Sequence, residues 1–283
     1  MTSMASSVDR TATPSPAEHG RANPVRSHAA TGGAATLTLK GVAHSFGGLQ
    51  VLRQVDIDVP AGRLVGLIGP NGSGKTTCFN IASGFLRQKA GRVLLDGTDI
   101  SAANVQERSR AGVVRTFQAP KVFEQMTVLD NLMVGAHKST CTGVLAAMLG
   151  TRGSRAELAA TRADAEQCAR RFGLESLLST RAGLLPAGQR RIVELARACM
   201  GRPRALLLDE PSSGLNSEEI EVLRRWIVEL NRDGLTVFLV SHDMGLMTVC
   251  DTVHVLYYGE IIASGSLAEV QEDPRVREAY LGV

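Results

Sequence analysis

Runs of almost entirely apolar residues mark three places where the chain crosses the interior of a sheet. Residues 64–68, 205–208 and 236–240 read LVGLI, ALLL and TVFLV. A strand that is covered on both faces reads as a continuous apolar run, as the strands of parallel sheets do. Helical segments lie between these runs, so the pattern predicts an α/β protein built on a parallel sheet.

Near the start of the chain, apolar and polar residues alternate instead. Residues 37–42 form one such stretch and residues 51–59 a second, with a glycine pair at 47–48 between them. A period of two is typical of half-buried strands, and a glycine turn joins antiparallel neighbours. With another short strand and turn expected at residues 91–97, the pattern predicts an antiparallel β-subdomain.

Helical spacing of apolar residues prevails over residues 127–178, including the Ala-rich stretches 144–148 and 155–172, with a turn near residues 150–153. We expect this segment to belong to an α-helical subdomain spanning about residues 119–200. The remaining expected elements are strands at 113–117, 252–257 and 261–263, helices at 189–200 and 217–230, and a last helix approaching Tyr280.

The first 35 residues differ in composition from the rest. They are rich in Ala, Ser, Thr, Pro and Gly, with few large apolar side chains and no periodic face. Such a segment cannot bury enough apolar surface to offset its ordering entropy. The sequence therefore predicts a disordered N-terminal extension over residues 1–35 and one folded domain over residues 36–283.

Composition narrows the class of protein. The chain has 283 residues, is 44% hydrophobic and carries a formal net charge of +3. No apolar run reaches the roughly 18 residues that cross a bilayer, and no Lys/Arg stripe marks a nucleic-acid surface. The most prominent basic pair of the folded part is Arg190 and Arg191, and a solvated helix face explains this pair as well as a partner does. The protein is expected to reach a membrane only through partners.

The five cysteines are scattered and form no Cys-x-x-Cys pair. An odd, unpatterned set of this kind argues against a disulfide framework or a zinc site and favours a reducing cytosol. Cys78 follows a glycine-rich turn, where a helix start can lower a thiol pKa. We nevertheless expect Cys78 to be structural.

The segment GPNGSGKTT connects the first apolar run to a helix expected to begin near Thr76. Glycines let backbone N–H groups turn toward an anion, a lysine contacts the β- and γ-phosphates, and a hydroxyl after it reaches Mg²⁺. A glycine turn followed by a chance Lys-Thr pair is the alternative. The spacing predicts a nucleoside triphosphate site made of Gly69, Pro70, Asn71, Gly72, Ser73, Gly74, Lys75, Thr76 and Thr77.

Polar groups follow several of the expected strands. Asp209 and Glu210 end the second apolar run, Gln118 ends the strand at 113–117, and His242 comes just after the third run. Ligands of open α/β sheets bind at the carboxyl ends of the strands. The two carboxylates are therefore expected at the phosphate site, whereas a lone histidine is more often structural and a lone amide is weak evidence. Phe46 fits a purine-stacking ring and a core residue equally well.

Taken together, the order of these motifs closely resembles the nucleotide-binding subunit of ABC transporters over residues 36–283. The resemblance implies the P-loop NTPase fold of an ABC ATPase, with ATP and Mg²⁺ as ligands. RRIVELARA after LPAGQ, SGLNSEE and the ending DPRVREAYLG look most like the ATP-binding subunits of branched-chain amino acid transporters. The matching motifs are Phe46, GPNGSGKTT as Walker A, Gln118 as the Q-loop, LPAGQ from Leu185 to Gln189 as the signature, LLLDEP from Leu206 to Pro211 as Walker B, SGLN from Ser213 to Asn216 as the D-loop, and His242 as the switch histidine.

The resemblance also implies roles for these residues. Glu210 would act as the general base and His242 would contact the γ-phosphate. Asp209, Gln118 and Thr76 would hold Mg²⁺, directly or through water. Phe46 would stack on the adenine, and Gly188 and Gln189 of a second subunit would contact the triphosphate.

The chain departs from the family pattern in its signature, which is usually written LSGGQ. Pro186 and Ala187 replace the serine and the first glycine, so a hydroxyl that would contact the γ-phosphate is absent. The D-loop carries Asn216 in place of the more common aspartate. Because this divergence is also what the branched-chain subgroup looks like, and because Glu210 is a glutamate, the resemblance implies a site competent for hydrolysis.

The partners implied are transmembrane permease subunits, a second ATP-binding subunit that is either an identical chain or a paralogue, and indirectly a substrate-binding protein. No nucleic acid is expected, and the implied location is the cytoplasmic face of the cell membrane. Three alternatives stay open: an ABC ATPase of lipid or polysaccharide export, a soluble ABC ATPase, and an ordinary P-loop kinase. The soluble class should carry two cassettes or a coiled-coil insertion, and neither is seen. The kinase should lack the signature, D-loop and switch histidine, which are present.

Overall fold

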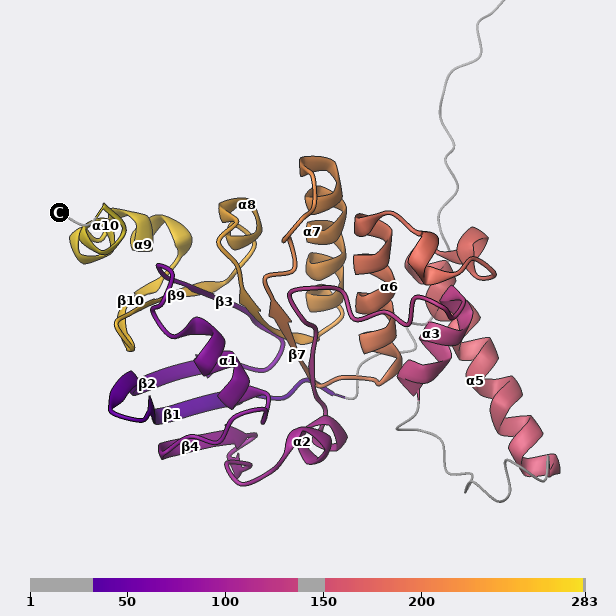
Figure 1. Ribbon diagram of the computed structural model, residues 1–283, viewed down its shortest axis with the longest axis horizontal. Helices are drawn as coiled ribbons and strands as arrows, with labels where there is room; N and C mark the ends of the chain where they lie inside the picture. The colour runs from indigo at the N-terminus through magenta and orange to yellow at the C-terminus, as the bar shows by residue number, and fades with distance from the viewer. Residues whose placement is uncertain (1–32, 137–150, 282–283) are drawn as a thin grey trace, which may run out of the picture.

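The computed structural model describes residues 33–136 and 151–281, which fold around two sheets (Figure 1). The larger sheet has six strands in the order β10-β9-β3-β8-β7-β6. Strands β9, β3, β8, β7 and β6 run parallel, and β10 pairs antiparallel with β9. Their bounds are β3 Leu64–Ile68, β6 Val113–Arg115, β7 Ala205–Asp209, β8 Thr236–Val240, β9 Thr252–Tyr257 and β10 Glu260–Gly265.

All three apolar runs are confirmed as strands of this parallel sheet. Every residue of β3, β7 and β8 is buried. Alternate side chains enter two different cores: Val65 and Leu67 of β3 face one, whereas Leu64 and Ile68 face the other. The apolar runs are continuous because both faces of these strands are buried.

The smaller sheet has the order β2-β1-β4-β5 and is antiparallel. It comprises β1 Leu37–Phe46, β2 Leu49–Val59, β4 Ala90–Leu95 and β5 Thr98–Asp99. Helix α1, Lys75–Ala82, shares a core with this sheet and one face of the parallel sheet, and the rings of Phe79 and Phe238 lie 4.7 Å apart. The expected antiparallel strands are thus confirmed.

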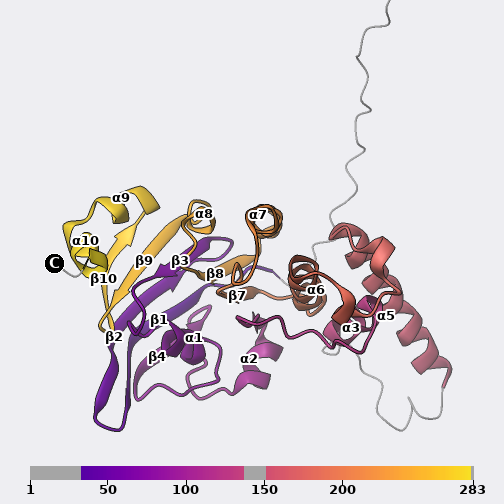
Figure 2. The same ribbon diagram turned by 45° about the horizontal axis from the view of Figure 1, so that its top comes forward.

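The opposite face of the parallel sheet is covered by helices (Figure 2). They are α7 Ser217–Arg232, α8 Met244–Met247, α9 Leu267–Glu272 and α10 Pro274–Leu281. Helix α7 buries Leu223, Ile227 and Leu230 at helical spacing against the strands. Helix α2, Val105–Ala111, was not expected from the sequence and follows β5.

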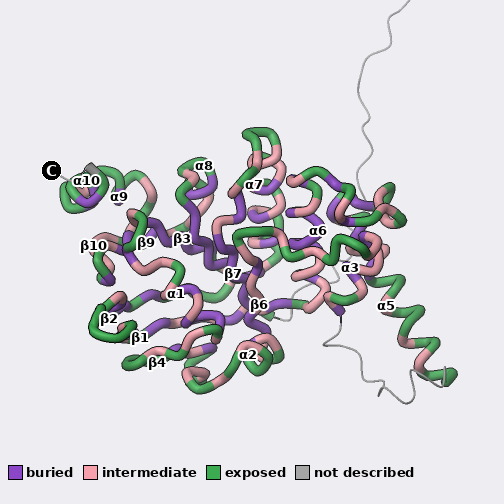
Figure 3. Tube along the Cα trace, viewed as in Figure 1, coloured by how far each residue is buried: buried purple, intermediate pink, exposed green. Residues whose placement is uncertain are grey.

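Three helices extend the fold at one end, where Figure 3 shows most of α5 exposed. They are α3 Val128–Gly135, α5 Arg152–Arg171 and α6 Ala187–Met200. The short 3₁₀ segments η2 Glu175–Leu177 and η3 Ala182–Leu184 lie between α5 and α6. Gly135 lets α3 approach α6 closely, since a Cβ there would lie 2.3 Å from the Arg197 carbonyl oxygen. The subdomain boundary of about residues 119–200 stays a prediction.

Several expectations about element ends are corrected. The turn expected near residues 150–153 is wrong at Gly153, because Thr151 caps α5 and the helix begins at Arg152. The predicted end of the disordered extension, residue 35, is too late. Ala35 is fully buried, and its carbonyl accepts a hydrogen bond from Thr236 Oγ1 at 2.9 Å. Residues 1–32 of that extension and the stretch 144–148 lie outside the described residues. Within the described ranges, no helix is both long and apolar enough to span a membrane.

Candidate functional site

The glycine-rich turn lies between the end of β3 and the start of α1, as expected. Gly74 adopts φ 110° at the helix start, a conformation that L side chains rarely take. Gly69 is required for a different reason, because a Cβ there would lie 2.1 Å from the carbonyl oxygen of Leu256. The turn therefore packs directly against β9 while its tip, at Asn71 and Gly72, is exposed.

Lys75 folds back over this turn. Its Nζ donates to the carbonyl oxygens of Gly69 at 2.7 Å and Pro70 at 2.9 Å. Burial lowers the pKa of Lys75, and the charge of Glu210 opposes that shift. Ser73 Oγ, also buried in the turn, has no hydrogen-bond partner among the described residues. An ammonium held by carbonyls and an unsatisfied hydroxyl are groups that a phosphate would engage.

Strand β7 delivers both carboxylates of the Asp209-Glu210 pair to the same end of the sheet. Asp209 Oδ2 forms an ion pair with Arg115 Nη2 at 2.6 Å. Glu210 has the left-handed φ of 45°, and its N–H donates to Val240 O at 2.8 Å. A positive φ on a glutamate is uncommon, and such backbone strain concentrates at functional sites.

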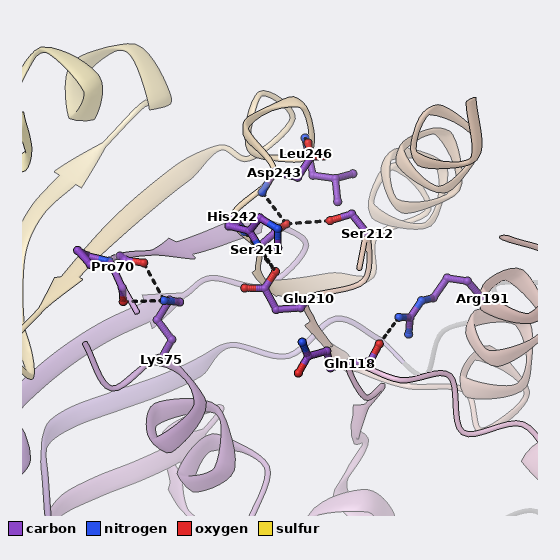
Figure 4. A network of polar contacts seen from close by, with 11 residues as sticks. Pro70, Lys75, Gln118, Arg191, Glu210, Ser212, Ser241, His242, Asp243 and Leu246 are labelled. Atoms are coloured by element: carbon purple, nitrogen blue, oxygen red, sulfur yellow. Dashed lines mark hydrogen bonds and ion pairs between the residues drawn. The ribbon is translucent and has the colours of Figure 1, made fainter. Parts of the chain in front are cut away.

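The turn after β8 brings His242 onto Glu210, as Figure 4 shows. His242 Nδ1 lies 2.7 Å from Glu210 Oε2, and the His242 backbone N–H donates to the same oxygen at 3.3 Å. The His242 side chain is 75% exposed, whereas the Glu210 side chain is only 15% exposed. Since the exposed ring contacts the candidate base, the geometry favours the functional interpretation of His242 over the structural one.

Gln118 lies just beyond β6 and is exposed. Its amide is on the side of the site where Glu210 lies (Figure 4). The backbone around it is held from α6: Arg191 Nη1 donates to Phe117 O at 2.7 Å, Arg191 Nη2 donates to Gln118 O, and Lys121 N donates to Glu194 Oε1 at 3.1 Å.

Of the two explanations of the basic pair, a solvated helix face is therefore wrong for Arg191. Arg191 is 1% exposed and pairs with the equally buried Glu194, with Nη1 and Oε2 2.6 Å apart. A buried charge must be paired and hydrogen-bonded, and the backbone around Gln118 supplies those bonds. The Arg-x-x-Glu spacing in the sequence was the signal that could have indicated this pair.

The signature segment LPAGQ starts α6. The Gly188 N–H donates to Glu219 Oε1 at 3.0 Å, and Glu219 Oε2 accepts from the Asn216 N–H at 3.0 Å. The carboxylate thus caps two helix starts, since the Asn216 side chain in turn accepts from the Glu219 N–H. Sequence reasoning missed Glu219, although Asn216-x-x-Glu219 has the spacing of a capping box.

The exposure of Phe46 and of Cys78 decides between the two interpretations of each residue. Phe46 is 53% exposed at the end of β1, with its ring edge-on to His44 at 4.7 Å between centroids, so it is not a core residue. Cys78 is fully buried, and burial raises the pKa of its thiol to about 12. The structural interpretation of Cys78 is the one that fits.

The donor set suits Mg²⁺ bound together with phosphates. Within residues 33–136 and 151–281, no three His, Cys, Asp or Glu side chains are grouped to hold a metal by themselves. Mg²⁺ typically takes one or two protein ligands plus phosphate oxygens and water. Asp209, and Thr76 on the exposed face of the first turn of α1, are groups of the right chemistry. Together the side chains at the ends of β3, β7 and β8 can bind a triphosphate and activate a water.

Comparisons with protein families agree with this site. Residues 52–213 match the family described as ABC transporter, and residues 260–283 match one described as branched-chain amino acid ATP-binding cassette transporter. The chain is 38% identical to BraF of Pseudomonas aeruginosa and 37% to LivG of Escherichia coli, both high-affinity branched-chain amino acid transport ATP-binding proteins, over 87% of the chain and 97% of each relative. It is also 34% identical to the lipopolysaccharide export ATP-binding protein LptB of E. coli, over 88% of the chain and 98% of the relative.

Solved structures give the same result for the fold. A nucleotide-free ATP-binding cassette of an ABC transporter superposes with a TM-score of 0.76 at 31% identity, covering 88% of this chain and 100% of that one. A cassette in its ADP conformation superposes with a TM-score of 0.76 at 30% identity, covering 88% and 99%. The expected ABC ATPase fold is confirmed.

Proposed function

Because the chain belongs to the ABC transporter family of ATP-binding subunits, we propose that it hydrolyses ATP to drive the import of branched-chain amino acids or related compounds through separate permease subunits. The observation that carries the hydrolytic part is the contact between Glu210 and His242 beside the Walker A turn. At 2.7 Å, the carboxylate and the imidazole are within hydrogen-bond reach of each other. A single water bound between these two groups and a γ-phosphate would lie within reach of both.

In this proposal Glu210 accepts a proton from the attacking water while His242 orients the carboxylate and contacts the γ-phosphate. When ATP binds, Lys75 exchanges its two loop carbonyls for phosphate oxygens. Its positive charge therefore already lies where the negative charge of the transferred phosphoryl group develops. Mg²⁺, held by Thr76, Asp209 and Gln118 directly or through water, would neutralise the β- and γ-phosphates. The positive end of α1 and the Ser73 hydroxyl complete the binding of the anion.

A second ATP-binding subunit is part of the proposal. The signature of one chain would close over the Walker A turn of the other, with the N–H groups of Gly188 and Gln189 at the phosphate. A symmetric pair has two equivalent sites. In the single chain the Gly188 N–H is taken by Glu219, so closure requires this carboxylate to leave that N–H.

The transport direction and substrate rest on the relatives. The C-terminal match over residues 260–283 and the BraF and LivG similarity favour the import of branched-chain amino acids. The LptB similarity favours lipopolysaccharide export as a second candidate. In either case the subunit would lie on the cytoplasmic face of the membrane beside its permeases, with a substrate-binding protein acting only in the import arrangement.

The decisive experiment is reconstitution. The chain is co-expressed with the permeases whose genes neighbour its own, and the complex is purified. It is then reconstituted into proteoliposomes and supplied with Mg·ATP. Uptake of radiolabelled leucine or valine that requires ATP and the matching binding protein is the expected result. Isolation without any hydrophobic permease, with an ATPase rate that permeases do not change, contradicts the transport function.

A further inference from the structure

Arg115, at the end of β6, lies at the centre of the site although no nucleotide-contact motif includes it. Its side chain is 7% exposed and bonds three side chains, which belong to β7 and to α1 with its C-cap residue. Nη2 lies 2.6 Å from Asp209 Oδ2, and Nη1 donates to Asn80 Oδ1 at 2.7 Å and to Ser83 Oγ at 2.9 Å. The residue therefore links the strand that ends in Asp209 to the helix that follows the Walker A turn.

Aromatic rings restrict the guanidinium further. Its Cζ lies 5.4 Å from the ring centroids of Phe85 and Phe117 and 5.8 Å from that of Phe79. Rings at this distance favour a cation and exclude water from its sides. Arg115 consequently has little freedom to turn, and the Asp209 oxygen that it binds is fixed with it.

The ion pair uses only one oxygen of Asp209. Within the described residues, no hydrogen bond reaches Oδ1. Carboxylates that ligate metals are commonly hydrogen-bonded by outer residues, which set the orientation of the ligand. An arginine is suited to this task because its planar guanidinium holds its N–H donors in fixed directions, so that one nitrogen binds Asp209 while the other binds Asn80 and Ser83.

We propose that Arg115 is a positioning residue for metal binding: it holds Asp209 by Oδ2 and leaves Oδ1 for Mg²⁺ of the bound nucleotide, directly or through water. The inference rests on the proposed ATPase function. It further assigns Asn80 and Ser83 as anchors that tie the orientation of Asp209 to α1, so the metal ligand and the phosphate-binding helix are held in register by one side chain.

The test measures metal affinity separately from turnover. In a Glu210→Gln background that retains ATP, the binding of Mn²⁺ to the ATP-bound protein is followed by the electron paramagnetic resonance signal of free Mn²⁺. Arg115→Gln is expected to weaken Mn²⁺ binding by about 10- to 100-fold. Arg115→Lys, which keeps the charge but not the fork, is expected to weaken it by about fivefold, a smaller loss because the cation stays. Binding of a fluorescent ATP analogue in EDTA should change less than about twofold, because no metal takes part in it.

Arg108 supplies the matched control. It is also buried and also bonds α1, through the carbonyl oxygens of Ile81 and Ala82, but it contacts no carboxylate of the site. Arg108→Gln should lower the melting temperature and leave the Mn²⁺ affinity of the ATP complex unchanged. The comparison separates a loss of packing from a loss of metal positioning.

The outcomes are distinguishable. Mn²⁺ affinity within about twofold of the parent in folded Arg115→Gln and Arg115→Lys, or an equal loss in Arg108→Gln, overturns the inference. If Arg115→Gln does not fold, Arg115→Lys decides alone. A Glu210→Gln parent that binds no ATP analogue at all overturns the proposed function instead. Hydrolysis of Mg·ATP by the protein with Glu210 intact, together with Mn²⁺ binding that the Arg115 substitutions leave unchanged, overturns only the role of Arg115.

Discussion

The two ends of the proposed ATP site are built differently. The Walker side stands on β3, β7 and β8, whose residues are all buried, and its groups contact one another: Lys75 with the turn, Arg115 with Asp209, Glu210 with His242. The signature side is the start of one helix, and its Gly188 N–H is satisfied by the single carboxylate of Glu219.

This difference indicates which side is preorganised. Strands held on both faces by packed side chains position a group without help from ligand. A helix start that is capped by a side chain of its own chain must exchange that cap for a phosphate. We infer that catalysis is determined on the Walker side and that the signature side determines when the site closes.

The largest effect is expected at Glu210. Glu210→Gln removes the general base but keeps the shape of the side chain, so the turnover number should fall by about 10²- to 10⁴-fold, while ATP binding stays and an ATP-bound dimer accumulates. Steady-state ATPase assays and size-exclusion chromatography with ATP measure the two effects. Glu221→Gln, at an exposed ion pair of α7, is the control and should leave both unchanged. Undiminished turnover in Glu210→Gln contradicts the assignment of the base.

A smaller effect is expected at Phe46, on the Walker side but at the exposed end of β1. If its ring stacks on adenine, Phe46→Ala loses about 1 kcal/mol of stacking and raises the Michaelis constant for ATP about fivefold with little change in turnover. Leu49→Ala, on the paired residue of the same hairpin, is the control for a general loss of apolar surface. An unchanged Michaelis constant would remove Phe46 from the nucleotide site.

A modest effect of the opposite sign is expected on the signature side. Glu219→Ala removes a negative charge from the start of α6 and frees the Gly188 N–H. An anion at that helix start then meets no competing carboxylate, so the Glu210→Gln variant should dimerise at an ATP concentration about threefold lower. The loss of the capping box should also cost about 1 kcal/mol of stability, seen as a lower melting temperature.

Glu218→Ala serves as the comparison for Glu219→Ala. It removes a charge from the same turn of α7, but no hydrogen bond of Glu218 to α6 exists in the described structure. Dimerisation that responds equally to both substitutions would assign the effect to net charge, and dimerisation that is harder in Glu219→Ala would contradict the competition between carboxylate and phosphate.

No effect at all is expected at one residue of the Walker side. Burial raises the pKa of the Cys78 thiol to about 12, so at pH 8 the thiol is protonated as well as enclosed. Iodoacetamide at pH 8 should leave Cys78 unmodified in the native protein and modify it in urea, as read by peptide mass spectrometry. Modification of native Cys78, with loss of ATPase, would show that α1 opens.

Sequence reasoning was most accurate where burial is two-sided. The strands at 64–68 and 236–240 were predicted with the bounds that the structure has, and that at 205–208 to within one residue, because nearly every residue of such a strand is apolar. It failed where one face of a helix is buried by polar contacts. Arg191 reads as a surface residue by type, yet it is enclosed because the backbone near Gln118 and the carboxylate of Glu194 satisfy it.

The sequence by itself therefore determined the family, the phosphate-binding turn, the acidic strand end and the order of the motifs, since each of these depends on neighbours along the chain. Only the tertiary structure decided that Arg115 holds Asp209, that His242 contacts Glu210 and that Glu219 caps the signature helix. Each of these contacts joins residues 31 to 94 positions apart. A local pattern carries no information about such pairs, because their geometry is set by how the strands and helices pack.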